Sequence, residues 1–165
     1  MLHTSLHFSA GQTQYWHRAS GDNAYDRWEC TLVSVDDRQR IGIEYINLDH
    51  WTTPAGTFSS PLRDPTLVPE DDKEDHSTPI TLPGHEGQGW MIGRSPDPQA
   101  RTVLAWQYPD GYYLIVSMRY EEGAPAPDNN AQALQDLAVA VIDRIPPIAA
   151  GPDQEFTIHP DDQST

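Results

Sequence analysis

Histidine and carboxylate side chains near the middle of the chain are the residues best suited to binding a metal ion. His76 follows the acidic run Pro69 to Asp75, and His85 and Glu86 stand a little further along. Imidazole nitrogen and carboxylate oxygen both coordinate divalent ions. Their spacing matches neither the H-E-x-x-H motif nor the calcium loop of EF-hand proteins. We therefore predict no metal site, and keep His76, His85 and Glu86 only as residues from which one could be assembled.

The other motifs that could support chemistry are incomplete. Gly84 to Gly89 reads G-x-x-G-x-G, but a phosphate cradle needs a preceding strand, a following helix and ideally a lysine, and these are missing. There is no G-x-S-x-G motif for a serine nucleophile. Cys30 is the single cysteine and is expected to be a buried structural thiol in a strand. The sequence therefore predicts no cofactor, no catalytic residue and no enzyme activity.

Tryptophan side chains are the most useful binding material in the sequence. Trp28 and Trp106 fall inside predicted strands and are expected in the core. Trp51 and Trp90 border a proline-rich segment and could form an aromatic patch for a partner; anchoring a loop or filling the core is the alternative for both. Trp51 and Trp90 are thus the candidate partner-binding residues.

The chain is strongly acidic, with 25 Asp and Glu against 10 Lys and Arg in 165 residues, a formal charge of −15. Binding to nucleic-acid phosphates or anionic membranes rests on Lys and Arg, so we expect neither. A protein or peptide partner is expected instead, and the oligomeric state is left open. No segment reaches the roughly 18 apolar residues of a membrane span. Residues 1–8 do not resemble a signal peptide, so a cytoplasmic location is expected as written, and an extracytoplasmic one if the N-terminus is truncated.

A β-hairpin and a helix dominate the C-terminal half. Val103 to Tyr108 and Tyr112 to Met118 are rich in aromatic and β-branched residues, and Pro109-Asp110-Gly111 between them is a typical turn. Successive apolar residues place both strands centrally in a sheet. A helix is expected from Asp128 to Asn130 onward and should end at Pro146-Pro147. Its apolar stripe consists of Leu134, Leu137, Ala138, Val141, Ile142 and Ile145.

A second hairpin is predicted between Trp28 and Leu48. One face of its first strand carries Trp28, Cys30 and Leu32, and one face of its return strand carries Ile41, Ile43 and Tyr45. The elements predict an α+β fold, an antiparallel sheet built from hairpins with a C-terminal helix packed on one face. We expect one domain over residues 1–150 with a mobile proline-rich acidic loop at 52–78, and an extended acidic tail at 151–165. Short strands are expected at Gln14 to His17, Thr78 to Leu82 and Glu155 to His159, and another element, of unassigned type, at Gly89 to Gly93.

Several segments of the chain together resemble a known group of proteins. They are Leu82 to Gly84, Gln88 to Trp90, Thr102 to Val116, and Leu134 to Pro147 with its end Arg144-Ile145-Pro146-Pro147. This order is similar to the C-terminal half of small actinobacterial envelope proteins, secreted lipoproteins and sensor-like extracytoplasmic domains, in which a strand pair precedes a helix ending in Arg-(Ile/Leu)-Pro. Trp28 to Leu32 resembles their cysteine-containing strand. The resemblance implies an α+β domain that acts as a binding or accessory module.

A second interpretation stays open. An acidic cytoplasmic inhibitor or immunity-type protein would use its negative surface to cover a basic enzyme or to mimic DNA phosphates. Binding that weakens as salt rises would favour this interpretation. Salt-insensitive binding centred on Trp51 or Trp90 would favour the binding or accessory module instead.

Overall fold

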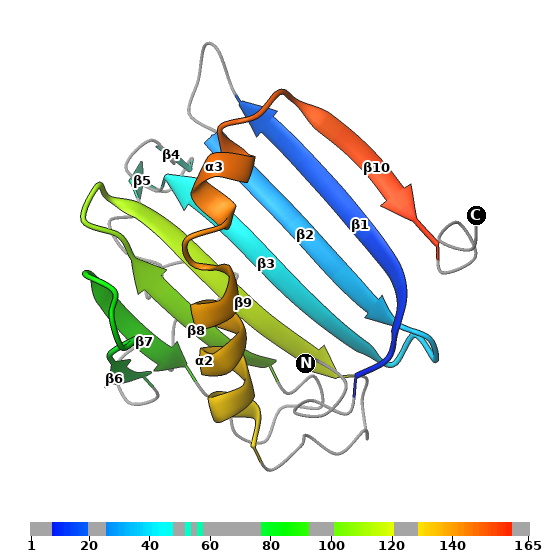
Figure 1. Cartoon of the computed structure of the whole chain (residues 1–165), viewed down its shortest axis with the longest axis horizontal. Helices are drawn as coiled ribbons and strands as arrows, with labels where there is room; N and C mark the ends of the chain where they lie inside the picture. Colours follow the sequence, from blue (N-terminus) through cyan, green and yellow to red (C-terminus); the bar gives the residue numbers. More distant parts are fainter. Residues whose placement is uncertain are drawn as a thin grey trace.

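The computed structural model describes residues 8–19, 26–47, 52–53, 56–57, 77–92, 101–120 and 129–159. Eight of its strands form one antiparallel sheet in the order β10-β1-β2-β3-β9-β8-β7-β6, and a C-terminal helix packs on one face (Figure 1). The predicted α+β fold is therefore confirmed.

The N-terminal half of the sheet is a meander of three strands, β1 (Ala10–Ala19), β2 (Asp26–Ser34) and β3 (Gln39–Asn47). β2 and β3 form the predicted hairpin. Their register pairs Trp28 with Tyr45 and Cys30 with Ile43. Since paired residues lie on the same face of a sheet, the predicted faces of this hairpin are confirmed.

The second half of the sheet consists of β6 (Ser77–Ile80), β7 (Gln88–Ile92), β8 (Arg101–Gln107) and β9 (Tyr112–Tyr120). β8 and β9 form the predicted central hairpin. Its turn is closed by Asp110, whose Oδ1 accepts a 3.2 Å hydrogen bond from the Tyr112 N–H, and by Gly111 with φ of 90°. β9 pairs with β3 and so joins the two halves. β4 (Thr52–Thr53) and β5 (Gly56–Thr57) form a separate small pair.

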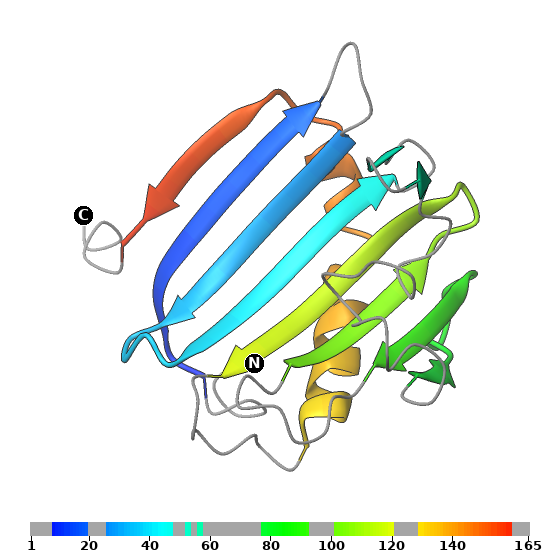
Figure 2. The same cartoon turned by 180° about the vertical axis from the view of Figure 1, so that it is seen from behind.

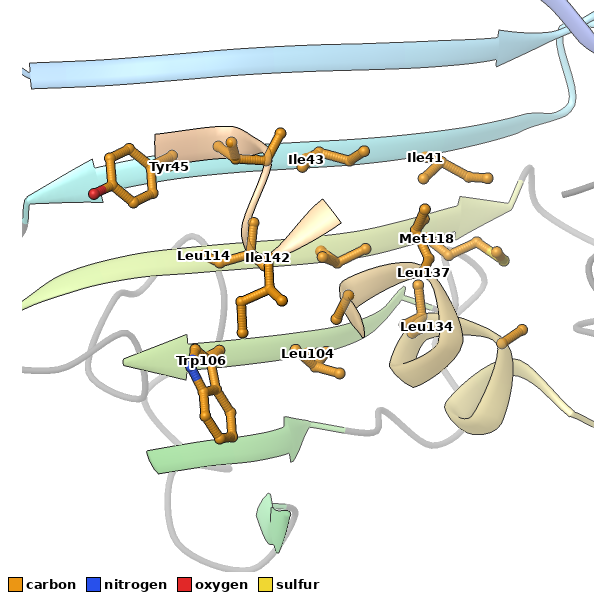
Figure 3. Packing of buried hydrophobic residues seen from close by; sticks show 14 of the residues in the cluster. Ile41, Ile43, Tyr45, Leu104, Trp106, Leu114, Met118, Leu134, Leu137 and Ile142 are labelled. Atoms are coloured by element: carbon orange, nitrogen blue, oxygen red, sulfur yellow. The ribbon is translucent and has the colours of Figure 1, made fainter. Parts of the chain in front are cut away.

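The helix α2 (Asn130–Val141) lies over β8 and β9. Figure 3 shows Leu134 and Leu137 of α2, and Ile142 just after it, among side chains of the strands. These strand residues are all buried, and the labelled ones are Ile41, Ile43, Tyr45, Leu104, Trp106, Leu114 and Met118. Trp28 and Trp106 are 4% and 1% exposed, so their predicted place in the core is confirmed.

The predicted end of the helix at Pro146-Pro147 is wrong. α2 ends at Val141, and a second short helix, α3 (Ile145–Ala149), contains both prolines and contacts β3. The first residues of a helix donate no intrahelical hydrogen bond, so a proline there loses nothing by lacking its N–H. The two prolines therefore lie in the first turn of α3.

Two tyrosine hydroxyls tie α2 to the ends of the β8–β9 hairpin. The Tyr120 hydroxyl, at the end of β9, donates a 2.7 Å hydrogen bond to Oδ1 of Asn130, which is buried at the helix start. The Tyr108 hydroxyl, just after β8, donates a 2.8 Å hydrogen bond to the carbonyl oxygen of Ile142. Hydrogen bonds near both ends of α2 therefore hold the helix on the hairpin, in addition to the burial of its apolar stripe.

The chain returns to the sheet after α3. β10 (Gln154–Ile158) pairs with β1 at the edge of the sheet, where an edge strand was predicted. Phe156 stacks on Tyr15 with ring centroids 4.5 Å apart. The sheet thus extends past residue 150, into the segment predicted to be a tail. Most of the predicted loop at 52–78 lies outside the described residues.

Replacing Leu137 by aspartate should unfold the domain. The side chain is 9% exposed, so the change removes apolar contacts worth about 2–5 kcal/mol and buries a carboxylate. Val139 on the same helix is 42% exposed and is the matched control, because Val139→Asp should cost less than about 1 kcal/mol. Urea unfolding followed by circular dichroism measures both. An unchanged midpoint for Leu137→Asp would contradict the core assignment.

Removing either tyrosine hydroxyl that holds α2 should also lower stability. Tyr120→Phe leaves the buried Asn130 oxygen without this donor, and Tyr108→Phe does the same to the Ile142 carbonyl, at a cost of about 1–3 kcal/mol each. Tyr15→Phe keeps the stack with Phe156 and should change stability by less than about 0.5 kcal/mol. Thermal melts of the three variants give the comparison. Equal melting temperatures for all three would show that the hydroxyl bonds do not hold the helix.

Candidate functional site

The face of the sheet that points away from α2 carries no helix among the described residues, as Figure 2 shows for β10, β1, β2 and β3. We call it the open face. Its side chains alternate along each strand with those of the core. On β2, Cys30 packs against the core cluster and Glu29 and Thr31 therefore lie on the open face. On β3, Ile43 is in the core and Gly42 and Glu44 lie on the open face.

A row of small or polar residues crosses the open face from strand to strand. The strand pairings place side by side Thr157 of β10, Gln14 of β1, Thr31 of β2, Gly42 of β3 and Ser117 of β9. Two hollows, of about 220 Å³ and about 320 Å³, lie along this row and share Gln14, Glu29 and Thr31 as lining residues. We call this row with its two hollows the polar groove.

Gly42 gives the polar groove its depth at β3. A Cβ atom at this position would lie 2.9 Å from Ser117 Oγ, so a larger residue would fill the groove. Ser117 is only 4% exposed and is one of the residues that line the 220 Å³ hollow. The Ser117 hydroxyl is thus placed to bond a molecule in the groove.

Charged side chains of opposite sign stand on the two sides of the 220 Å³ hollow. Arg40 and Arg119 face each other across the β3–β9 pairing and form a basic wall. Glu44 and Glu29 face each other across the β2–β3 pairing and form an acidic wall. The Thr31 hydroxyl donates a 3.3 Å hydrogen bond to Glu29 Oε1 and holds that carboxylate beside the groove. In the neighbouring 320 Å³ hollow, Trp16 of β1 pairs with Glu29 on one side and with Glu155 of β10 on the other.

A larger hollow of about 610 Å³ lies beside α2, and we call it the helix hollow. Leu82 and Pro83 line one side, and Asp136 and Val139 of the helix are among the residues on the other. It offers apolar contact and one carboxylate. The polar groove differs from it by presenting groups of both charges and a buried hydroxyl.

The two tryptophans predicted to bind a partner are not brought together by the described structure. Trp51 lies outside the described residues. Trp90 is half-buried on β7 and pairs with Ala105 of β8 and Pro79 of β6. Trp90 pairs with Ala105, Ala105 pairs with Ile115 of β9, and Ile115 pairs with Glu44 of β3. Trp90 therefore lies on the same face of the sheet as the polar groove, but two strands away from it.

The residues named for a metal site have other surroundings. His76 lies outside the described residues, and Glu86 is exposed. His85 Nδ1 lies 3.5 Å from Oδ1 of Asp143, an ion pair when the imidazole is protonated. Across the described ranges, no group of three or more His, Cys, Asp or Glu side chains is arranged to hold a metal ion.

The glycine-rich segment 84–89 serves the packing of Trp106. A Cβ atom on Gly89 would lie 2.6 Å from the Trp106 ring, and one on Gly87 would lie 2.8 Å from Trp106 Nε1. Gly84 and Gly87 also have φ values of 82° and 148°, which other residues rarely adopt. The glycines thus let a buried indole and a tight turn lie close together.

Cys30 lies on the core side of β2, away from the polar groove. Burial and, secondly, the charge of neighbouring Glu29 raise the pKa of the Cys30 thiol to about 11. At neutral pH the thiol is therefore protonated, and it is a poor nucleophile in that form.

Comparisons of the chain with protein-family models, with curated proteins and with solved structures found no match. Among the helices that the structure describes, none has the length and apolar character needed to cross a membrane.

Part of the polar groove follows from a signal that the sequence contains. The alternation that predicts Cys30 and Ile43 in the core also places Glu29, Thr31 and Gly42 on the other face. Sequence reasoning missed the site because the groove also needs Ser117 and Arg119, which come from the pairing of β3 with β9. That pairing joins strands distant in the sequence, and no local pattern specifies it.

The protein should lose stability as pH rises from about 9 to 11. In this window the unfolded chain releases the Cys30 proton while the folded chain keeps it, because the folded pKa is about 11. The stabilisation is complete below pH 9 and falls by on the order of 1–2 kcal/mol by pH 11. Burial also raises the pKa values of Tyr108 and Tyr120, which adds a loss of the same sign. Urea unfolding of wild type and Cys30→Ser against pH isolates the cysteine, and identical slopes would contradict its raised pKa.

Proposed function

We propose that this protein is a non-enzymatic binding domain that holds a small polar ligand in the polar groove. The observation that carries the proposal is the preformed hollow over Gly42, which has the buried Ser117 hydroxyl at its floor and charged walls of both signs. Sites on strands of a rigid sheet hold ligand-binding groups more precisely than sites on loops. The resemblance to actinobacterial envelope proteins supports an accessory role at the cell envelope.

The chemistry of the groove favours binding over catalysis. Its arginine, glutamate, glutamine, serine and threonine side chains can hold a ligand by hydrogen bonds and ion pairs. The single thiol, Cys30, lies on the other face of the sheet and is protonated at neutral pH. Ser117 could act as a nucleophile only with an adjacent base, and no histidine lines the hollow that contains it.

The alternative of an acidic inhibitor requires a continuous negative surface for its basic partner. The formal charge of −15 supports it. The polar groove does not, because Arg40 and Arg119 balance Glu29 and Glu44 around the 220 Å³ hollow. The binding domain is therefore the function that this face supports best.

Nuclear magnetic resonance with a panel of defined small compounds tests the proposal. The panel contains amino acids, dipeptides, monosaccharides, nucleotides, dicarboxylates and polyamines, each titrated into ¹⁵N-labelled protein. We expect at least one class to give saturable shifts of the backbone amides of Thr31, Gly42 and Ser117. Gly42→Val fills the groove and should weaken this binding at least about tenfold, or about 1.4 kcal/mol.

Thr78→Val is the matched control, because Thr78 is an exposed residue on the edge strand β6, away from the groove. It should bind like the wild type. Shifts confined to Leu82 and Val139 would assign binding to the helix hollow. Either that result or the absence of shifts from every class would overturn the proposed site.

A further inference from the structure

We propose that the ligand of the polar groove is a small zwitterion of dipeptide size, with a free carboxylate and a free ammonium group. The carboxylate lies against Arg40 and Arg119 and the ammonium group against Glu29 and Glu44, while Ser117 bonds the atoms between them. This inference rests on the proposed binding function and adds the chemical class of the ligand.

Two pairs of like charges face each other on adjoining strands of the groove. Arg40 is directly opposite Arg119, and Glu44 is directly opposite Glu29. Like charges directly opposite each other destabilise an antiparallel pair. A carboxylate between two arginines and an ammonium group between two glutamates would meet each wall with the opposite charge, which a ligand with one charge cannot do.

The two walls are too far apart for their charges to cancel fully across the groove. Arg40 and Glu44 are four residues apart on β3, which corresponds to about 13 Å between their Cα atoms. An extended dipeptide spans about 7 Å, and the arginine and glutamate side chains of the two walls are long enough to cover the remaining distance. The hollow of about 220 Å³ has the volume of roughly seven water molecules. Both measures fit a ligand of this size.

The existing contact of Arg40 does not oppose this role. Its Nη2 lies 3.3 Å from Asp37 Oδ1, and both side chains are more than half exposed. Exposed ion pairs of this kind contribute little to stability, so Arg40 can turn toward a ligand. Arg119, which is also exposed, makes no ion pair within the described ranges.

The charge of the whole chain also favours a zwitterion. A formal charge of −15 repels an anion that approaches the basic wall. It would attract a cation to any acidic part of the surface. A zwitterion has no net charge, so its binding depends on the two walls of the groove and not on the field of the whole protein.

Isothermal titration with four forms of one dipeptide tests the inference. Alanylalanine carries both charges, its N-acetyl form only the carboxylate, its C-terminal amide only the ammonium group, and the doubly blocked form neither. We expect alanylalanine to bind at least about tenfold more tightly than each blocked form, because each blocked form leaves one charged wall of the groove without an opposite charge.

Two variants assign the two ends of the ligand. Arg119→Gln should weaken alanylalanine and its N-acetyl form about tenfold and leave the amide form unchanged. Glu44→Gln should weaken alanylalanine and its amide form and leave the N-acetyl form unchanged. Arg38→Gln and Glu86→Gln remove the same charges at exposed positions outside the groove and should bind like the wild type. Thermal melts check that each variant is folded.

The outcomes separate this inference from the proposed function. If a blocked form binds as tightly as alanylalanine, or if alanylalanine does not bind while another class in the panel shifts Gly42 and Ser117, the zwitterion is wrong and the binding site stands. If no class shifts these amides, both are wrong. A weakening by Arg38→Gln equal to that by Arg119→Gln would also overturn the inference, because binding would then follow net charge alone.

Discussion

The packing of α2 on the β8–β9 hairpin is the interaction on which the rest of the structure depends. Leu134, Leu137 and Ile142 bring roughly 1.5–3 kcal/mol each from burial, a sum comparable with the whole net stability of a typical domain. The hydroxyls of Tyr108 and Tyr120 fix the two ends of the helix against the same hairpin. One helix thereby sets the place of β9, and β9 sets the place of β3 through their continuous pairing.

β3 couples the core to the polar groove. Ile41 and Ile43 on its inner side are buried in the core cluster, and Arg40, Gly42 and Glu44 on its outer side form the centre of the groove. A slip of one residue in the register would exchange the two sides, and the loss of apolar burial forbids it. The burial that holds the fold together therefore also fixes which side chains line the polar groove.

The sequence predicts the parts of this structure that local patterns specify. Alternation predicts the β2–β3 hairpin, and the Pro109 to Gly111 turn predicts the β8–β9 hairpin. The apolar stripe predicts α2. The predicted end of that helix was wrong because prolines fit the first turn of a helix, here α3, as well as the end of one. The groove was not predicted, since it needs the pairings of β3 with β9 and of β1 with β10, which join segments far apart in the chain. The sequence favoured Trp51 and Trp90 as binding residues instead, because aromatic residues occur at binding surfaces as well as in cores.

Several locally unfavourable features meet at one point of the sheet. A glycine inside a central strand loses conformational entropy and packs poorly, yet Gly42 lies in β3 between two strands. Two like-charge pairs flank it, and Ser117, a buried polar residue, lies beside it. In the rest of the described core most buried side chains are apolar, although the indole N–H groups of Trp28 and Trp106 are buried there without a hydrogen-bond partner. Natural proteins depart from local rules mainly where function requires it. The coincidence of these departures around Gly42, more than any single residue type, is why we propose the polar groove as the binding site.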